Sequence, residues 1–159
     1  MSSNKLSRLR QGFFKSRKVG SSSGAPAQQV AAICTRTKNE KREVLLITSR
    51  RTGRWVIPKG WPMFGLSDGD AAAQEAWEEA GIADAKISKK PIGTFSYEKL
   101  LNTDETIPVT VNVYRLKVRE TVKKFPECKQ RTRKWVSFKD ASDMVREPEL
   151  KKIMIAMHK

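Results

Sequence analysis

Short apolar runs alternate along the chain with segments of helical spacing, a pattern typical of a protein built from both strands and helices. Residues 108–118 carry apolar side chains at both parities, as expected for a strand that is partly buried on both faces. Residues 119–133 are predicted to form a polar loop, and two helices should follow, one from Asp140 and one opened by Pro148. Strands are predicted at residues 29–37, 43–49, 55–57, 92–101, 108–118 and 134–138.

The best-delimited helix is predicted over residues 68–80. Ser67 and Asp70 have the spacing of a capping box at its start. Gly81 follows its last turn, where a helix commonly ends in a residue with positive φ. A break at residues 58–60 precedes this segment, and its glycine permits a close approach of the backbone.

Three carboxylates of the predicted helix attract attention because Glu75, Glu78 and Glu79 occupy positions i, i+3 and i+4. This spacing places them on one helix face, where like charges repel one another in an isolated helix. A cation is expected to offset the repulsion. It could be a Lys or Arg side chain, or a hard divalent ion such as Mg2+ or Mn2+. An isolated EAWEEA fragment usually forms a solvated face, but the flanking helix signals favour a site.

The formal net charge of +15 points to an anionic partner, either a polyphosphate, a nucleic acid or a membrane surface. The charge is uneven, because residues 67–80 hold five acids and no base. Arg50, Arg51 and Arg54 stand directly before the strand that leads to this acidic helix. Guanidinium groups bind phosphate in bidentate fashion, so we expect at least one of the three to contact phosphate.

Several classes of protein are disfavoured. No apolar run reaches about 18 residues, so no membrane span is predicted. The basic start of the chain has no apolar signal-peptide stretch, and two cysteines do not indicate a disulfide framework. Cys34 is predicted to be a small core residue. His158 is the only histidine and lies next to the C-terminal residue, which argues against a histidine metal site or general base. The chain is predicted to be cytoplasmic.

The segment from Gly60 to Ile82 resembles the Nudix box, written G-x5-E-x7-R-E-U-x-E-E-x-G-U with U a bulky aliphatic residue. Leu66 stands where the family has Glu, and Gln74 stands where it has Arg. We interpret this double change as a structural replacement, since losing both partners is more benign than leaving one buried charge unpaired. A catalytically inactive protein is the alternative. The matching positions are Gly60, Glu75, Glu78, Glu79, Gly81 and Ile82.

The resemblance extends over about residues 28–156 and is closest to the diphosphoinositol and dinucleoside polyphosphate phosphohydrolase branch. The segments SRRTGRWVIPKG and FPECKQRTRKWVSFKDA suggest this branch. The resemblance implies an α/β fold of the Nudix type, an α/β/α sandwich with a mixed sheet, formed by residues 28–159. Residues 1–27 are predicted to be a basic flexible arm and linker. Residues 5–18 of this arm could form a short amphipathic helix, or the arm could be a disordered tail.

The resemblance implies a metal-dependent pyrophosphohydrolase that cleaves a small, highly charged substrate, either a diphosphoinositol polyphosphate or a diadenosine polyphosphate. An RNA 5′-end pyrophosphohydrolase and an inactive nucleic-acid-binding Nudix scaffold are the alternatives. The sequence does not indicate an oligomeric state.

Site residues follow from the same resemblance. Glu78 is the favoured general base, and Glu120 or Glu127 is a candidate for a further metal ligand outside the box. Tyr97 or Phe64 could supply an aromatic platform for a base. The predicted ligands of Mg2+ or Mn2+ are Glu75, Glu78, Glu79 and the carbonyl of Gly60. The predicted substrate-binding residues are Ser49, Arg50, Arg51, Arg54 and Lys59.

Overall fold

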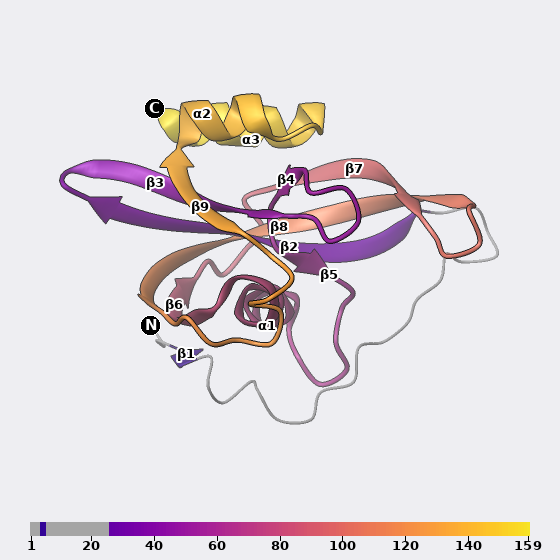
Figure 1. Ribbon diagram of the computed structural model, residues 1–159, viewed down its shortest axis with the longest axis horizontal. Helices are drawn as coiled ribbons and strands as arrows, with labels where there is room; N and C mark the ends of the chain where they lie inside the picture. Colours follow the sequence, from indigo (N-terminus) through magenta and orange to yellow (C-terminus); the bar gives the residue numbers. More distant parts are fainter. Residues whose placement is uncertain (1–3, 6–25) are drawn as a thin grey trace.

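In the computed structural model, the described residues are 4–5 and 26–159. Most of the N-terminal arm predicted at residues 1–27 lies outside them, as does nearly all of the amphipathic helix predicted at residues 5–18. Figure 1 shows the arrangement of the described elements. The strands are β1 (Asn4–Lys5), β2 (Ala27–Lys38), β3 (Lys41–Thr48), β4 (Trp55–Val56), β5 (Lys59–Gly60), β6 (Ile82–Ile87), β7 (Gly93–Leu100), β8 (Thr106–Thr121) and β9 (Arg133–Ser137). The helices are α1 (Asp68–Ala80), α2 (Phe138–Met144) and α3 (Pro148–His158).

The strands form one mixed sheet. Its centre is a parallel pair of β2 and β8, in which Ala27 lies opposite Val109 and Thr35 opposite Lys117. The other edge of β8 is shared between β7, along its first half, and β6, along its second half. The outer edge of β2 is shared in the same way between β5 and β3. Strand β3 therefore pairs only with the end of β2, and its own end separates from the start of β2. The short strand β5, which leads into α1, pairs with β2 in this gap.

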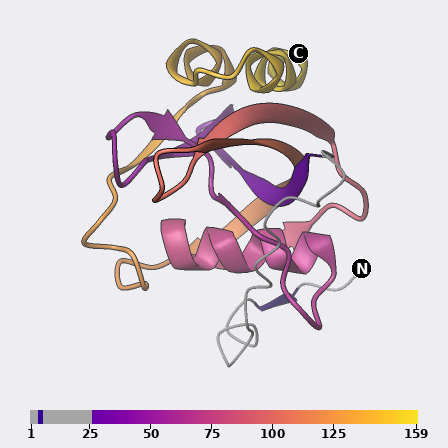
Figure 2. The same cartoon turned by 90° about the vertical axis from the view of Figure 1, so that its right-hand side faces the viewer.

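Helices cover both faces of the sheet, which confirms the predicted α/β/α sandwich. Figure 2 shows α1 below the sheet and the pair α2 and α3 above it. One core cluster lies on the α1 side and contains Val30, Cys34 and Ile47. The other lies on the side of α2 and α3 and contains Ile33, Leu46 and other apolar side chains of the sheet. Cys34 is fully buried, as predicted.

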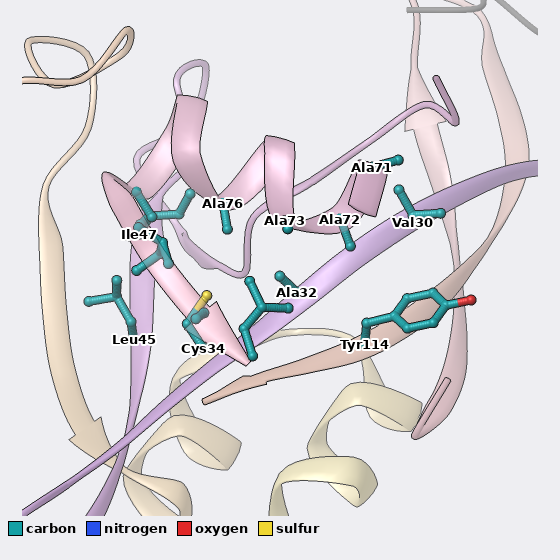
Figure 3. Packing of buried hydrophobic residues seen from close by; sticks show 14 of the residues in the cluster. Val30, Ala32, Cys34, Leu45, Ile47, Ala71, Ala72, Ala73, Ala76 and Tyr114 are labelled. Atoms are coloured by element: carbon teal, nitrogen blue, oxygen red, sulfur yellow. The ribbon is translucent and has the colours of Figure 1, made fainter. Parts of the chain in front are cut away.

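Alanines form the buried face of α1. Figure 3 shows Ala72, Ala73 and Ala76 facing Val30 and Ala32 of β2. Because these side chains are small, the helix lies close to the sheet and its carboxylates are carried near the strand ends. Packing of this kind, more than helix propensity, holds a helix of 13 residues in place.

The ends of α1 follow the predicted capping signals. The backbone N–H of Asp70 donates to Ser67 Oγ at 3.2 Å. Gly81 has φ of +70°, and its N–H donates to carbonyls of the last turn. A Cβ at Gly81 would lie 2.5 Å from the ring of Phe125 and 2.7 Å from the carbonyl oxygen of Val122. Glycine is therefore required here both by its backbone angle and by close packing against the segment after β8.

Three sequence predictions need correction. Residues 119–133 are not all loop, because β8 continues to Thr121 and β9 begins at Arg133. Residues 82–87 form strand β6, which is missing from the strands predicted from the sequence. Helix α2 begins at Phe138 rather than Asp140, because Ser137 is its N-cap and accepts from the N–H of Asp140 at 3.1 Å.

Candidate active site

A pocket of about 450 Å³ lies where β2 begins and β3 ends. Its wall is made by the loop between β3 and β4, by Lys59 of β5, by the end of β7 and by Glu79 of α1. All five predicted substrate-binding residues line it, although they come from a loop and a separate short strand. These are Ser49, Arg50, Arg51, Arg54 and Lys59.

The loop between β3 and β4 is held by a tight set of hydrogen bonds. The N–H of Ser49 donates to the carbonyl of Arg54 at 2.8 Å, and the N–H of Gly53 donates to the carbonyl of Ser49 at 3.0 Å. Gly53 has φ of +68°, a value that glycine adopts without strain. Arg50 and Arg51 stand at the exposed turn of this loop. The loop therefore presents two guanidinium groups on a defined backbone.

Arg54 differs from its neighbours because it already has a strong partner. Its Nη1 lies 3.0 Å from Oε1 and 3.4 Å from Oε2 of Glu147, the residue that precedes α3. Burial would raise the pKa of the Glu147 carboxyl, but the hydrogen bond and charge of Arg54 outweigh it and the pKa is lowered. The ion pair thus fixes α3 against the loop, and Arg54 offers less free charge to a ligand than Arg51 does.

Lys59 and Tyr97 form the inner wall of the pocket. Burial lowers the pKa of Lys59 to about 8, although the charge of Glu79 acts in the opposite direction. The Nζ of Lys59 lies 5.2 Å from the centre of the Tyr97 ring. The Tyr97 hydroxyl donates to Gln29 Oε1 at 2.6 Å, so the ring is held from both β2 and β5. Of the two aromatic candidates, Tyr97 lines the pocket, whereas Phe64 is 84% exposed and does not.

Arg131 is the main site residue that sequence reasoning missed, because it lies in a segment predicted to be a solvated loop. Its guanidinium is buried, donates to the carbonyl of Thr48 at 3.0 Å and lies 3.5 Å from Glu79 Oε1. It also pairs with Glu127 at 3.0 Å. The spacing of four between Glu127 and Arg131 was the available signal for this pair.

The loop after β8 reaches the site because α1 holds it. The N–H of Val122 donates to the carbonyl of Gly81, and the N–H of Glu127 donates to the carbonyl of Glu78 at 3.0 Å. Glu127, one of the two candidate ligands outside the box, is therefore near α1 but engaged with Arg131 and, at 3.4 Å, with Arg50. The other candidate, Glu120, is exposed on β8 opposite Asp84 and does not line the pocket.

The three box carboxylates differ in their surroundings. Glu75 and Glu79 are buried, whereas Glu78 is half-buried. Only Glu79 lines the pocket, where its Oε1 accepts from the backbone N–H of Lys59 at 3.4 Å. The residue spacing thus predicts the shared helix but not these three separate environments.

The Glu75 carboxylate lies directly against the backbone of Gly60, and this contact bears on whether a divalent cation fits here. A Cβ added at Gly60 would overlap the Glu75 carboxylate, so the missing side chain leaves a space that this carboxylate fills. Carboxylate and carbonyl oxygens are the donors that Mg2+ and Mn2+ prefer, so the donor set fits such an ion. Within residues 26–159, three acidic side chains are not gathered closely enough to form a ready-made metal site.

The two departures from the box pattern are both directed toward the protein interior. Leu66 packs against the core cluster on the α1 side. Gln74 is buried, and its Oε1 has no hydrogen-bond partner among the described residues. An apolar contact thus stands at the position of the family's Glu, while the interpretation of the two changes as a structural replacement stays a prediction.

Three more residues that line the pocket were not predicted from the sequence. Lys99 and Arg146 add positive charge from β7 and from the connection before α3, and Gln29 adds an amide from β2. No local pattern marks them, because long-range packing alone brings these segments to the pocket. Lys99 has its pKa lowered, chiefly by burial and against the charge of Glu79.

The fold and the pocket define an α/β/α protein in which a carboxylate-bearing helix adjoins a cationic site. The NUDIX domain family matches residues 27–156, and the chain belongs to this family. The protein "Nudix hydrolase 16, mitochondrial" of Arabidopsis thaliana is 31% identical over 116 residues, which is 71% of this chain and 63% of that protein. The human "Diphosphoinositol polyphosphate phosphohydrolase 3-alpha" is 34% identical over 55 residues, 35% of this chain and 34% of that protein.

Solved structures show the same fold. The C. elegans Ap4A hydrolase binary complex has a TM-score of 0.62 and 21% identity, and the match covers 82% of this chain and 94% of that one. The chain spans 63% and 53% of the first two curated relatives, whose names both include the word mitochondrial. The cytoplasmic location therefore stays a prediction. No helix in the described part of the chain is long and apolar enough to cross a membrane.

Proposed function

We propose that this protein is a metal-dependent Nudix pyrophosphohydrolase that cleaves a phosphoanhydride bond in a small, densely charged substrate, a diphosphoinositol polyphosphate or a diadenosine polyphosphate. The observation that carries the proposal is the charge of the pocket beside α1. Its lining includes two glutamates, Glu79 and Glu98. Its cations are Arg50, Arg51, Arg54, Lys59, Lys99, Arg131 and Arg146.

The cations differ in how far protein carboxylates neutralise them. Arg50, Arg54 and Arg131 have ion pairs with glutamates. Arg51 and Arg146 are exposed, and among the described residues neither has an ion pair. Charge-assisted hydrogen bonds contribute roughly 1.5–3 kcal/mol each, so unpaired guanidinium groups are the strongest candidates to grip phosphates. A substrate with many phosphates makes use of all of them, whereas a nucleotide sugar offers only two.

We assign the acidic residues the following roles. Glu75 and Glu79 with the carbonyl of Gly60 would hold Mg2+ or Mn2+, and Glu78 would share in this or accept the proton of the attacking water. A divalent cation, when bound, neutralises phosphate charge. Arg131 orients Glu79 from one side while the backbone N–H of Lys59 does so from the other. Lys59 then stabilises the negative charge that develops on the phosphate.

The relatives support the proposed substrate class through their names, which include diphosphoinositol polyphosphate phosphohydrolases and an Ap4A hydrolase. Tyr97 in the pocket provides an aromatic ring for a diadenosine substrate, and the excess of cations favours a diphosphoinositol polyphosphate. Both a diphosphoinositol polyphosphate and a diadenosine polyphosphate are therefore tested as substrates.

The test is a hydrolysis screen with Mg2+ or Mn2+ on both substrates, a nucleotide sugar and an RNA with a 5′-triphosphate. We expect a polyphosphate to have the highest kcat/KM, and excess EDTA to abolish turnover. Glu79→Gln keeps size and helix propensity but removes the charge, and it should reduce the rate at least ~100-fold, about 2.7 kcal/mol of transition-state stabilisation. Turnover in EDTA, or a wild type that prefers the nucleotide sugar, would contradict the proposal.

A further inference from the structure

A second pocket of about 330 Å³ lies at the opposite end of the sheet, where β2 ends and β3 begins. Gln29 of β2 lines the candidate active site, and Thr35 of the same strand lines the second pocket. Six residues of extended chain separate them, which corresponds to about 20 Å. The second pocket is therefore separate from the site described above, and we call it the distal pocket.

The distal pocket is lined by cations and hydroxyl groups from three neighbouring strands. Thr35 and Thr37 come from β2, Arg42 from β3, and Arg115 and Lys117 from β8. The strand register explains this convergence. Thr37 lies opposite Arg42 in the pairing of β2 with β3, and Thr35 lies opposite Lys117 in the pairing of β2 with β8. The side chains thus form a short row across the sheet.

Positive charge in the distal pocket is not neutralised by acids. Among the residues that the structure describes, its lining contains no Asp or Glu. Arg36 also borders it, but that guanidinium pairs with Glu43 at 2.9 Å and stacks on Trp135. Within the same part of the chain, Arg42, Arg115 and Lys117 have no ion pair.

The Arg115 side chain supplies an independent sign that the pocket takes a ligand. Its Nε is buried and has no hydrogen-bond acceptor among residues 26–159. A buried donor without an acceptor is unfavourable by about 1–3 kcal/mol, and more for a charged group. An anion in the pocket would supply the acceptor. The donors present are the guanidinium and ammonium groups and the hydroxyl of Thr37, since the Thr35 hydroxyl already donates to the carbonyl of Leu116. Guanidinium and ammonium groups bind phosphate oxygens.

Phe138 shapes the remaining wall of the distal pocket. The guanidinium of Arg42 lies 5.4 Å from the centre of this ring, so one face of Arg42 is covered and its edge stays available for hydrogen bonds. A volume of this size is at the small end of ligand pockets and suits a compact molecule. It does not resemble the extended basic groove that follows a nucleic-acid backbone.

We propose that the distal pocket is a non-catalytic binding site for a small phosphorylated molecule, held by Arg42, Arg115 and Lys117. The proposal does not depend on the hydrolase activity, since the box carboxylates and the candidate active site contribute nothing to it. It adds a second place at which this basic protein recognises phosphate.

The experiment is a titration of the full chain with inorganic pyrophosphate in EDTA, followed by NMR. EDTA prevents turnover, and the residue-specific signals separate the two pockets. We expect saturable shifts of the Arg115 Nε–H and of the backbone amides of Thr35 and Thr37. The double variant Arg115→Gln with Lys117→Gln should weaken this binding at least ~10-fold. Arg42→Gln should weaken the binding as well. Because Arg42 is exposed, this variant should fold normally and tests the site even if the double variant has a folding defect.

A charge-matched control distinguishes a built site from general attraction to a basic surface. Lys38→Gln with Lys41→Gln removes two charges at the same end of the sheet, where both lysines are exposed and neither lines the distal pocket. We expect its pyrophosphate affinity at the distal pocket to stay within twofold of wild type. Equal weakening in both double variants, or pyrophosphate shifts confined to the candidate active site, would overturn the proposal. So would a ten-nucleotide RNA that shifts the distal signals when pyrophosphate does not.

Discussion

The guanidinium of Arg131 lies 3.5 Å from the carboxylate of Glu79, although 52 positions separate the two residues along the chain. Both side chains are buried, with exposed fractions of 8% and 9%. Arg131 also contacts Glu127 and the carbonyl of Thr48, so one cation ties α1, the end of β3 and the loop after β8 together. Its removal would leave buried acceptors without their cation.

We therefore expect Arg131→Gln to lower the free energy of unfolding by about 3 kcal/mol, because breaking a buried pair leaves an uncompensated charge. Urea denaturation at neutral pH measures this change. Arg119→Gln is the control, since Arg119 is 45% exposed and lies 3.9 Å from Asp84. Exposed pairs of that kind contribute less than about 1 kcal/mol. Similar losses in both variants would show that Arg131 has no special structural role.

Gly60→Ala should reduce kcat/KM at least ~100-fold with the fold retained, a loss of about 2.7 kcal/mol in transition-state stabilisation. The physical reason is that the new Cβ would overlap the Glu75 carboxylate and displace it. Steady-state kinetics with Mg2+ and circular dichroism of both proteins measure the two parts of this prediction. Gly69→Ala is the matched control, because the nearest neighbours of its Cβ would be Ile87 at 3.2 Å and Tyr114 at 3.5 Å, neither of them a box carboxylate. Normal activity of Gly60→Ala would remove Gly60 and Glu75 from the proposed site.

Arg51→Ala combined with Arg146→Ala should reduce kcat/KM by at least ~100-fold for the most highly phosphorylated substrate and less for a nucleotide sugar. Each lost charge-assisted contact removes roughly 1.5–3 kcal/mol. Kinetics on a diphosphoinositol polyphosphate, a diadenosine polyphosphate and a nucleotide sugar give the comparison. Lys129→Ala removes an exposed charge that does not line the pocket and serves as the control. An equal decrease on all three substrates would argue against phosphate recognition by these arginines.

Stability should depend on pH through Glu147. Its folded pKa lies below the ordinary value of 4.5, so the stabilisation is present above that value and is lost as the pH falls through the folded pKa. Glu147→Gln should therefore lower the free energy of unfolding at pH 7 more than at pH 3. Denaturant titrations at both pH values measure the difference. Glu105→Gln, at an exposed turn, should show little effect at either pH. A pH-independent loss in Glu147→Gln would contradict the ion pair with Arg54.

The sequence predicted those features whose causes are local. Helix α1 has its capping serine, its apolar face and its final glycine within one continuous segment, so its bounds were confirmed at both ends. The mixed sheet between helix layers was predicted from the family resemblance, and the structure confirms it. The cluster Ser49, Arg50 and Arg51 was predicted from the family resemblance, and its members line one pocket because they are neighbours on one loop.

What escaped prediction depends on contacts between distant segments. Lys99 carries no local sign that it lines the pocket, and the local signal at Arg131, its spacing from Glu127, does not indicate that it reaches Glu79; the packing of β7 and of the loop after β8 brings both to the pocket. Glu127 stays a predicted candidate for a metal ligand, but the sequence did not reveal its ion pairs with Arg131 and Arg50. The start of α2 was predicted too late because Ser137 is both the last residue of β9 and the N-cap of the helix, so no loop separates the two elements.

The parallel pairing of β2 with β8 has a consequence for how the chain acquires its structure. The paired residues are about 80 positions apart, so the centre of the sheet closes only after a long loop has been brought together. During synthesis β2 emerges well before β8 exists, and its apolar stretch Val30–Cys34 has no partner on that edge in the meantime. Exposed strand edges of this kind promote aggregation. We therefore expect the closing of this central strand pair to limit the folding rate.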